Sequence, residues 1–172
     1  MNRQPLREAL NRIEDLAKEI DSNVPSNKPS LSDFRSDLAG LLNVTVCATY
    51  ENCVKLIIHD YSGRQSPKFL TYTQNQYDKI NSRIDLGDLH KYAKTFSPDI
   101  HRIFKSKLSS VKDYYLERTS SDIIDAYSQL LKWRHDFAHT GQRVTTVEEV
   151  LRHHKLGKRV ILTFSDAFSS TS

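Results

Sequence analysis

The first part of the chain alternates apolar and polar positions with the period of an α-helix. Its apolar residues recur at helical spacing: Leu6, Ala9, Leu10, Ile13, Leu16, Ala17 and Ile20. This spacing places them on one face of a helix. Prolines at positions 25 and 29 cannot continue it. The pattern therefore predicts an amphipathic N-terminal helix over residues 1–22.

The longest apolar pattern covers residues 34–61 and keeps helical spacing over about eight turns. Within it, residues 44–50 (VTVCATY) have the β-branched and aromatic composition of a strand. A helix is favoured, because the apolar positions stay in phase through that stretch and no turn residue interrupts them. Residues 62–68 (SGRQSPK) then predict a loop.

The middle of the chain carries helix start and stop signals. Residues 69–96 are polar and tyrosine-rich and predict one or two short helices around Gly87. The run Ser97-Pro98-Asp99 starts a helix, with serine as the cap and proline in the first turn. Residues 119–122 (TSSD) cap the next helix, and Gly141 is placed to end it.

Two further elements are expected after Gly141. A capping box, either Thr145–Glu148 or Thr146–Glu149, starts a helix that runs to about residue 155. Gly157 is expected to end it, and residues 159–168 to form a final helix or strand. The tail 169–172 (SSTS) is expected to fray. The chain is thus expected to be a single all-α domain over residues 1–172.

Composition adds three constraints. The excess of 25 Lys and Arg over 21 Asp and Glu gives a net charge of +4, which permits an anionic partner without requiring one. Cys47 and Cys53 are six residues apart and point to different faces of a helix, so no disulfide is expected and a reducing cytoplasm is the natural setting. No apolar signal segment and no membrane span are expected either.

The helix before Gly141 holds the densest group of titratable side chains, in the sequence WRHDFAHTG at residues 133–141. In an ideal helix His135 and His139 lie about 40° apart around the axis, one turn apart along it, and share a face. Arg134 lies about 140° from His139. Three interpretations of this group follow.

A metal site is one interpretation. HDFAH has the histidine spacing of the zinc-protease helix, with Asp136 where those enzymes have a glutamate base. Aspartate is one methylene shorter, and a third ligand would have to come from residues at no known spacing: Glu148, Glu149, His153 or His154. A metal-dependent hydrolase is therefore the least favoured function.

Metal-free cleavage of RNA is the second interpretation. Attack by the 2′-OH needs a base for its proton, an acid for the leaving 5′-oxygen, and a cation beside the phosphate. Histidine serves as base or acid near neutral pH, and the arginine fork fits phosphate oxygens. Arg134-x4-His139 holds both groups, and a symmetric dimer would double them around one phosphate. The third interpretation is structural: the helix dipole favours cations in the last turn.

Residues 125–141 (DAYSQLLKWRHDFAHTG) resemble the signature helix of the HEPN superfamily, whose ribonuclease members carry an R-x(4–6)-H motif. His135 fills the polar position after the arginine, where asparagine is commoner. The whole segment is most similar to the RiboL-PSP-HEPN branch. An acid within a long apolar helix, in ATYENCVKLI at residues 48–57, is also similar to a family feature and makes Glu51 a site candidate.

The resemblance implies a HEPN-like antiparallel helical bundle with extra short helices, and a homodimer whose motif helices face each other across a cleft. It implies a metal-independent endoribonuclease that leaves 2′,3′-cyclic phosphate and 5′-OH ends and needs no cofactor. Family members act as toxins, antiphage effectors or RNA-processing enzymes, so an antitoxin or regulatory protein is a possible partner beside RNA. The alternative is a catalytically silent module that binds RNA or a partner.

These considerations assign roles to particular residues. We expect His139 to act as general base or acid and Arg134 to stabilise the phosphate, with His135 and Asp136 assisting. Glu51 is equally well interpreted as an ordinary helix carboxylate. The basic run Arg152, His153, His154 and Lys155 either grips RNA phosphates at the cleft edge or is a solvated helix end.

Overall fold

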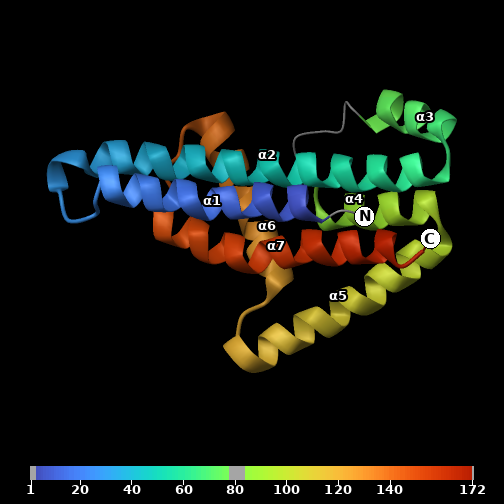
Figure 1. Ribbon diagram of the computed structural model, residues 1–172. Coiled ribbons are helices and arrows are strands. Elements are labelled where there is room, and N and C mark those ends of the chain that lie inside the picture. Colours follow the sequence, from blue (N-terminus) through green and yellow to red (C-terminus); the bar gives the residue numbers. More distant parts are fainter. Residues whose placement is uncertain (1–2, 78–83, 172) are drawn as a thin grey trace.

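The computed structural model describes residues 3–77 and 84–171, and these residues form seven α-helices and one 3-10 turn (Figure 1). The elements are α1 (Gln4–Asn23), η1 (Pro29–Leu31), α2 (Ser32–Gln65), α3 (Pro67–Tyr77), α4 (Leu86–Phe96), α5 (Pro98–Thr119), α6 (Ile123–Thr140) and α7 (Val147–Ser169). The all-α prediction is confirmed. Residues 44–50 are helical, so the strand alternative for them is wrong.

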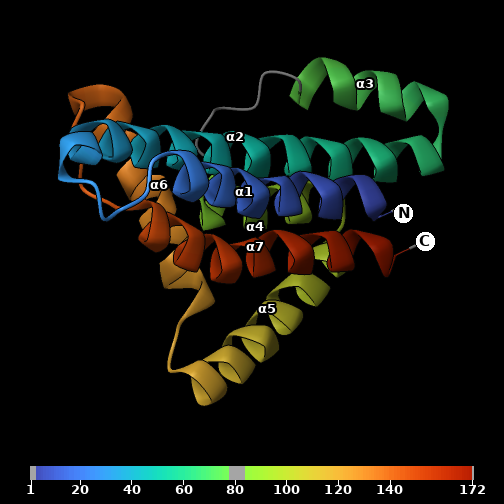
Figure 2. The same ribbon diagram turned by 60° about the vertical axis from the view of Figure 1, so that its left-hand side comes forward.

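Two antiparallel helix pairs form the bundle. The pairs α1–α2 and α6–α7 pack together, and α7 contacts α1, α2 and α6. The shorter α3 lies on the end of α2, and α4 packs on α5 (Figure 1). Figure 2 shows that α5 leaves the bundle at a steep angle, so that its C-terminal end lies away from α1 and α7. The expected antiparallel bundle with extra short helices is confirmed.

The helix boundaries follow the local capping signals. Ser97 accepts from the backbone N–H of residue 99, and Asp122 from that of residue 124. The capping box is the Thr146–Glu149 alternative, with both of its hydrogen bonds present. Gly141 ends α6 in the left-handed region, at φ 66°. Each of these signals lies within a few residues of the boundary that it sets.

The predicted helix end at Gly157 is wrong, because α7 runs without interruption from Val147 to Ser169. A Cβ at Gly157 would lie 3.2 Å from the Tyr127 Cα and from a methyl of Leu130, and 3.3 Å from the Tyr50 hydroxyl. Such distances are tighter than most real Cβ contacts. Glycine at this position therefore allows the close approach of α6 and α2 to α7, and does not end the helix.

Some apolar side chains of the helices lie outside the core. Phe34 and Leu41 of α2 are each 54% exposed, and Tyr114 of α5 is 48% exposed. Ala138 is exposed near the end of α6. The sequence pattern indicates which side of a helix is apolar, but not how far along that side a neighbouring helix covers it.

The segment Pro29–Gln65 is long and apolar enough to cross a membrane by length and composition alone. This corrects the expectation that no stretch approaches a membrane span. Half of the most apolar 18-residue stretch of this segment is buried inside the protein. The core helix of a soluble protein can be equally long and apolar. Because α2 contacts α1, α3, α6 and α7, its apolar residues are accounted for mainly by the core.

A buried polar cluster joins the four helices of the bundle. His154 of α7 is fully buried, with Nδ1 3.0 Å from the Tyr50 hydroxyl of α2 and Nε2 3.0 Å from the Leu10 carbonyl of α1. The ring of Tyr127, from α6, stacks on Tyr50 with centroids 5.5 Å apart. The Tyr127 hydroxyl in turn donates to the Ile84 carbonyl. Nearly every polar atom of the cluster thus has a partner, as burial requires.

The partners of His154 fix its tautomer. A backbone carbonyl can only accept, so Nε2 carries the proton and donates to Leu10. Nδ1 then accepts from the Tyr50 hydroxyl. Burial lowers the pKa of His154 to about 4, against a usual value of about 6.5, because the charged form would lose its hydration. The imidazole is therefore neutral at physiological pH.

We expect the stability of the protein to fall as the pH falls from about 6.5 to about 4. In that range the unfolded chain binds a proton at His154 that the folded chain excludes, so acid favours unfolding, by at most about 3 kcal/mol. Urea unfolding at a series of pH values measures this loss. His154→Gln should be less stable at pH 7 but lose less stability than the wild type on acidification. If the unfolding free energy of the wild type and of His154→Gln depends on pH in the same way, the lowered pKa of His154 is contradicted.

Candidate functional site

The helix α6, which carries the candidate motif, is held at both ends. The Asp122 carboxylate accepts from the backbone N–H of Ile124 at 2.8 Å and pairs with the Lys112 ammonium at 2.9 Å. Gly141 ends the helix, and His139 lies in its last turn. The free carbonyls of that turn favour a positive charge nearby. The motif thus occupies the C-terminal end of a capped helix.

His135 and His139 lie side by side on the surface. Both residues are exposed, and their ring centroids are 4.6 Å apart with the ring planes tilted by 50°. This is the shared face that their helical spacing predicts. Two imidazoles at this separation can both reach one bound group, either as two proton-transfer groups or as one such group and a neighbour that orients it.

Arg134 lies on another side of α6. It is half-buried, and its positive charge acts on the Cys47 thiol of α2. Burial raises the pKa of Cys47 to about 12, and the Arg134 charge opposes that rise. Asp136 is also half-buried. Within one chain, therefore, Arg134 is near α2 whereas His139 faces solvent.

The turn that bears Arg134 is fixed by contacts with α2. The Leu130 carbonyl accepts from the Asn43 side-chain amide at 2.9 Å and from the Cys47 thiol at 3.6 Å. In a regular helix the same carbonyl also accepts from the N–H of Arg134, four residues on. Asn43 and Cys47 are both buried. These contacts set the position of α6 along α2 at the point where the motif begins.

One turn further along, Phe137 lies directly over Gly40. A Cβ at Gly40 would overlap the Phe137 ring, so a side chain fits there only if that ring moves. The sequence reasoning missed both Gly40 and Asn43. A glycine and an asparagine inside the apolar run LAGLLNV at residues 38–44 were the signals that could have pointed to them.

The end of α6 is flanked by uncovered apolar side chains. Phe34 and Leu41 of α2 and Val144 of the loop after α6 are between 44% and 54% exposed. Arg143 holds that loop against α2, because its guanidinium donates to both carboxylate oxygens of Asp37, at 2.6 and 2.8 Å. The motif therefore lies beside a surface on which apolar groups meet solvent.

The arrangement offers no evident metal centre within residues 3–77 and 84–171. No three or more His, Cys, Asp or Glu side chains of these residues lie close enough together to hold an ion. His135 and His139 therefore lack, among these residues, the third ligand that a catalytic zinc site requires.

Comparison with known protein families gives one match, in which the model of the RiboL-PSP-HEPN family covers residues 7–170. The chain belongs to the RiboL-PSP-HEPN family. No curated protein and no solved structure matches it. Membership agrees with the all-α fold and with a general function as a ribonuclease or RNA-binding module.

Glu51, the candidate acid of this RiboL-PSP-HEPN domain, has a partner in its own helix. Its carboxylate pairs with the Lys55 ammonium at 2.8 Å, and both side chains are largely buried. Because α2 and α6 are antiparallel, with Gly40 beside Phe137 and Tyr50 beside Tyr127, Glu51 lies about two turns of α2 from the level of Arg134. The structure does not bring Glu51 to the histidine pair.

The four residues of the basic run in α7, residues 152–155, do not form one surface. The expectation that His154 contacts RNA is wrong, because it is fully buried in the core. His153 is half-buried, with its ring edge-on to Trp133 at 4.6 Å. Arg152 lines a hollow against α6, whereas the charge of Lys155 acts on Glu14 of α1. Arg152 and Lys155 are exposed, but they face different neighbouring helices.

We expect Gly40→Ala to destabilise the protein by about 1–2 kcal/mol. The methyl group would displace the Phe137 ring, and this destabilisation exceeds the gain from the higher helix propensity of alanine. Thermal unfolding measures the difference. Gly63→Ala in the same helix is the matched control: its Cβ would meet only a Leu70 methyl at 3.6 Å, so it should be neutral or stabilising by up to about 1 kcal/mol. A stabilising Gly40→Ala would contradict the close approach.

Proposed function

We propose that this RiboL-PSP-HEPN protein is a metal-independent endoribonuclease that cleaves RNA by attack of the 2′-OH. The observation that carries the proposal is the exposed histidine pair, with rings 4.6 Å apart, on the helix that also bears Arg134. Family membership supports the same class of function. Two imidazoles and a guanidinium are the side chains that such a cleavage needs near neutral pH.

The chemistry assigns each group a task. One imidazole, His139 in the proposal, takes the proton of the 2′-OH as that oxygen attacks phosphorus, or gives a proton to the departing 5′-oxygen. The products are a 2′,3′-cyclic phosphate and a 5′-OH, so atoms and charge balance without water. Arg134 stabilises the negative charge that develops on the phosphate oxygens. His135 is the second proton-transfer group or orients His139, and Asp136 assists.

A homodimer with the site at its interface is part of the proposal. Arg134 is half-buried near α2 whereas His139 is exposed, and the two side chains leave α6 in different directions. A second copy related by two-fold symmetry would bring another Arg134 and His139 to the same cleft. The exposed Phe34, Leu41 and Val144 beside the motif would be covered by that contact.

The biological setting remains a separate part of the proposal. A ribonuclease without a built-in restraint is harmful to its own cell, which fits a toxin or an antiphage effector in the cytoplasm. Such a protein requires an antitoxin or regulatory partner that covers the motif or prevents dimerisation.

We expect the purified protein to cleave a mixed-sequence RNA in the presence of EDTA. Arg134→Ala and His139→Ala should each lower the rate by about 10²–10⁴-fold, the usual contribution of an acid–base or charge-stabilising group. Gel analysis of end-labelled RNA measures the rate and shows whether the ends are cyclic phosphates. Arg102→Ala, which removes an exposed arginine of α5 paired with Asp99, should keep full activity.

Three outcomes would go against this mechanism. Loss of cleavage on chelation would replace it with metal catalysis. Cleavage of a substrate with 2′-deoxyribose at the cut position would exclude attack by the 2′-OH. Salt-sensitive RNA binding without cleavage would favour the silent RNA-binding module.

We expect Leu41→Asp to convert a dimer to a monomer and to abolish cleavage, because a charge would be buried in the contact. Light scattering after size exclusion measures the mass. Tyr72→Asp is the matched control, since Tyr72 is 58% exposed on α3, at the far end of α2 from the motif. It should leave both mass and activity unchanged. An active monomeric Leu41→Asp variant would show that one chain suffices.

A further inference from the structure

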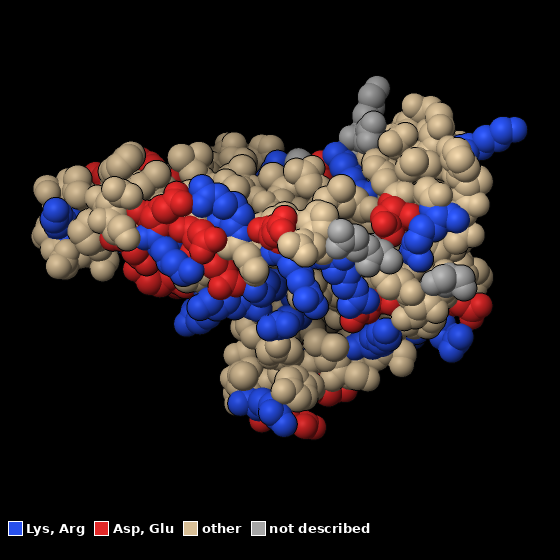
Figure 3. Space-filling view, in the orientation of Figure 1, with Lys and Arg blue, Asp and Glu red and all other residues tan. Residues whose placement is uncertain are grey.

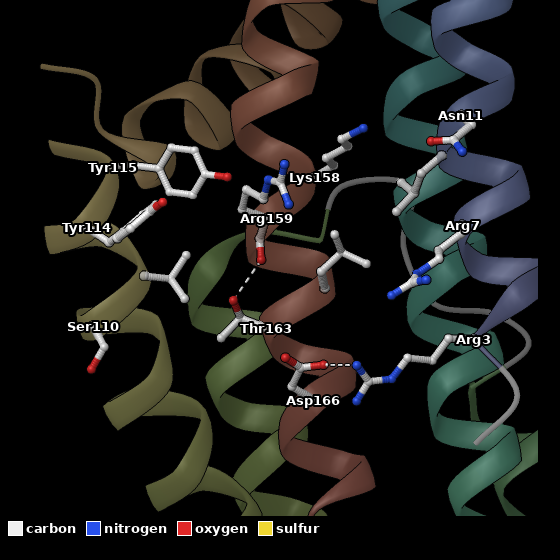
Figure 4. A pocket seen from close by; sticks show the side chains of 13 residues that line it. Arg3, Arg7, Asn11, Ser110, Tyr114, Tyr115, Lys158, Arg159, Thr163 and Asp166 are labelled. Atoms are coloured by element: carbon white, nitrogen blue, oxygen red, sulfur yellow. Dashed lines mark hydrogen bonds and ion pairs between the residues drawn. The ribbon is translucent and has the colours of Figure 1, made fainter. Parts of the chain in front are cut away.

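A groove of about 690 Å³ lies away from the motif, between α1, α5 and α7. It opens where α5 diverges from α7 (Figure 2). Residues 158–166 of α7 form its floor, and α1 and α5 form its two walls (Figure 4). Eight residues of an α-helix rise about 12 Å, so the floor is about two helical turns long. None of the motif residues lines the groove.

The groove is lined by four cations, which are spread along it. In the orientation of Figure 1, lysine and arginine side chains gather over α1 and α7, above α5 (Figure 3). Arg3 and Arg7 line the groove from α1, one helical turn apart, and Lys158 and Arg159 line it from α7. Asp166 is the only acid among the described residues of the lining. Positive charges distributed in this way suit several separate carboxylates better than one multiply charged group.

The two outer cations already hold carboxylates. At one end of the groove Arg3 of α1 pairs with Asp166 of α7 at 2.7 Å. At the other end the direction of the pair is reversed, because Lys158 of α7 pairs with Glu14 of α1. The helices α1 and α7 are thus joined across the groove by ion pairs at both of its ends.

Between these two ion pairs the series of carboxylates is interrupted. Arg7 and Arg159 form no ion pair with an acid of the described residues. The Arg7 side chain is exposed and points from α1 into the groove (Figure 4). The Nε of Arg159 is buried and has no hydrogen-bond partner. A buried donor without a partner is costly, and a carboxylate brought into the groove would satisfy it.

The wall opposite α1 is aromatic. Tyr114 and Tyr115 of α5 lie beside the groove, with ring centroids 5.4 Å apart (Figure 4). Tyr114 is 48% exposed. Between the tyrosines and α1 the lining is apolar and includes Leu10, Val111 and Leu162. An occupant that covers this surface needs apolar side chains beside its carboxylates.

The backbone of the groove favours a helical occupant. The lining comes from three helices, whose backbone N–H and C=O groups are bonded within each helix. The groove therefore offers side chains, and no sheet edge with which an extended peptide could pair. A helix satisfies its own backbone groups, and one of about two turns matches the length of the floor.

We propose that this groove binds a short, acidic, amphipathic helix of a partner protein. A carboxylate of that helix lies between Arg7 and Arg159 and completes the series of ion pairs, and its apolar side chains pack against the tyrosine wall. The surface is separate from the proposed ribonuclease centre, because its residues come from α1, α5 and α7 and not from α6. Its occupancy is therefore measurable whether or not the protein cleaves RNA.

A library of random twelve-residue peptides displayed on phage tests the proposal. Peptides are selected on the full-length protein and counter-selected on its Arg7→Gln variant. We expect the selected peptides to carry Asp or Glu together with Leu, Ile or Phe at helical spacing. In fluorescence polarisation, Arg159→Gln should weaken the binding of such a peptide about tenfold, since one charge-assisted contact is lost from the opposite helix. Replacing the contacting acid of the peptide with its amide should have a similar effect.

Further variants separate the groove from the rest of the protein. Tyr114→Ala should also weaken the peptide about tenfold, because a large ring of the contact is removed. Arg12→Gln is the matched control for charge. It removes an exposed arginine from α1, but Arg12 pairs with Glu19 and does not line the groove. Arg12→Gln and Arg134→Ala should both bind the peptide as the wild type does.

Several outcomes would overturn the proposal. These are a library in which no peptide distinguishes the wild type from Arg7→Gln, selected peptides that are neutral or basic, and equal weakening by Arg159→Gln and Arg12→Gln. If Arg7→Gln weakens the binding of a single-stranded RNA oligonucleotide while no acidic peptide binds, the groove is a path for RNA and not a docking surface for a protein.

Discussion

The contact between His154 and Tyr50 is the point on which the bundle depends. His154 comes from α7, Tyr50 from α2 and the Leu10 carbonyl from α1, and Tyr127 of α6 stacks on Tyr50. Four helices therefore meet around a few polar atoms in an apolar interior. Each of those atoms is costly to bury alone, so the hydrogen bonds fix the relative positions of the helices more strictly than apolar packing does. The position of α6 against α2, and with it the orientation of the motif, follows from this arrangement.

Much of the fold could be predicted from the sequence, where the cause of a feature is local. The starts at Ser97 and Asp122 and the end at Gly141 depend on residues within one turn, and the structure places all three as predicted. Gly157 and His154 were misjudged because their causes lie elsewhere in the chain. The small size of Gly157 leaves room for Tyr127 and Tyr50, which approach it closely. The polar ring of His154 forms hydrogen bonds with Leu10 and Tyr50. No pattern around residues 152–158 contains that information.

In the candidate site, too, features with a local cause could be predicted and features with a distant cause could not. Helical geometry alone predicts that His135 and His139 share a face, and the structure has their rings 4.6 Å apart. The same geometry predicts that Arg134 points elsewhere, and Arg134 is half-buried, with its charge acting on Cys47 of α2. What the sequence does not reveal is how α6 is held, because Gly40 and Asn43 act on α6 across a distance of about ninety residues in the chain. The motif residues can therefore be found from the sequence, whereas the residues that position them are found from the structure.

The distribution of positive charge follows a further rule of helix geometry. A run such as Arg152-His153-His154-Lys155 looks like a basic patch in the sequence, but successive residues of a helix are about 100° apart around its axis. Such a run is spread around the helix, and here one member is buried in the core while others face α6 and α1. A patch requires residues from neighbouring helices instead. Because α1 and α7 are antiparallel, Arg3 and Arg7 meet Lys158 and Arg159, and a net charge of only +4 suffices to make one locally cationic groove. This cluster of positive charge is thus a product of tertiary structure.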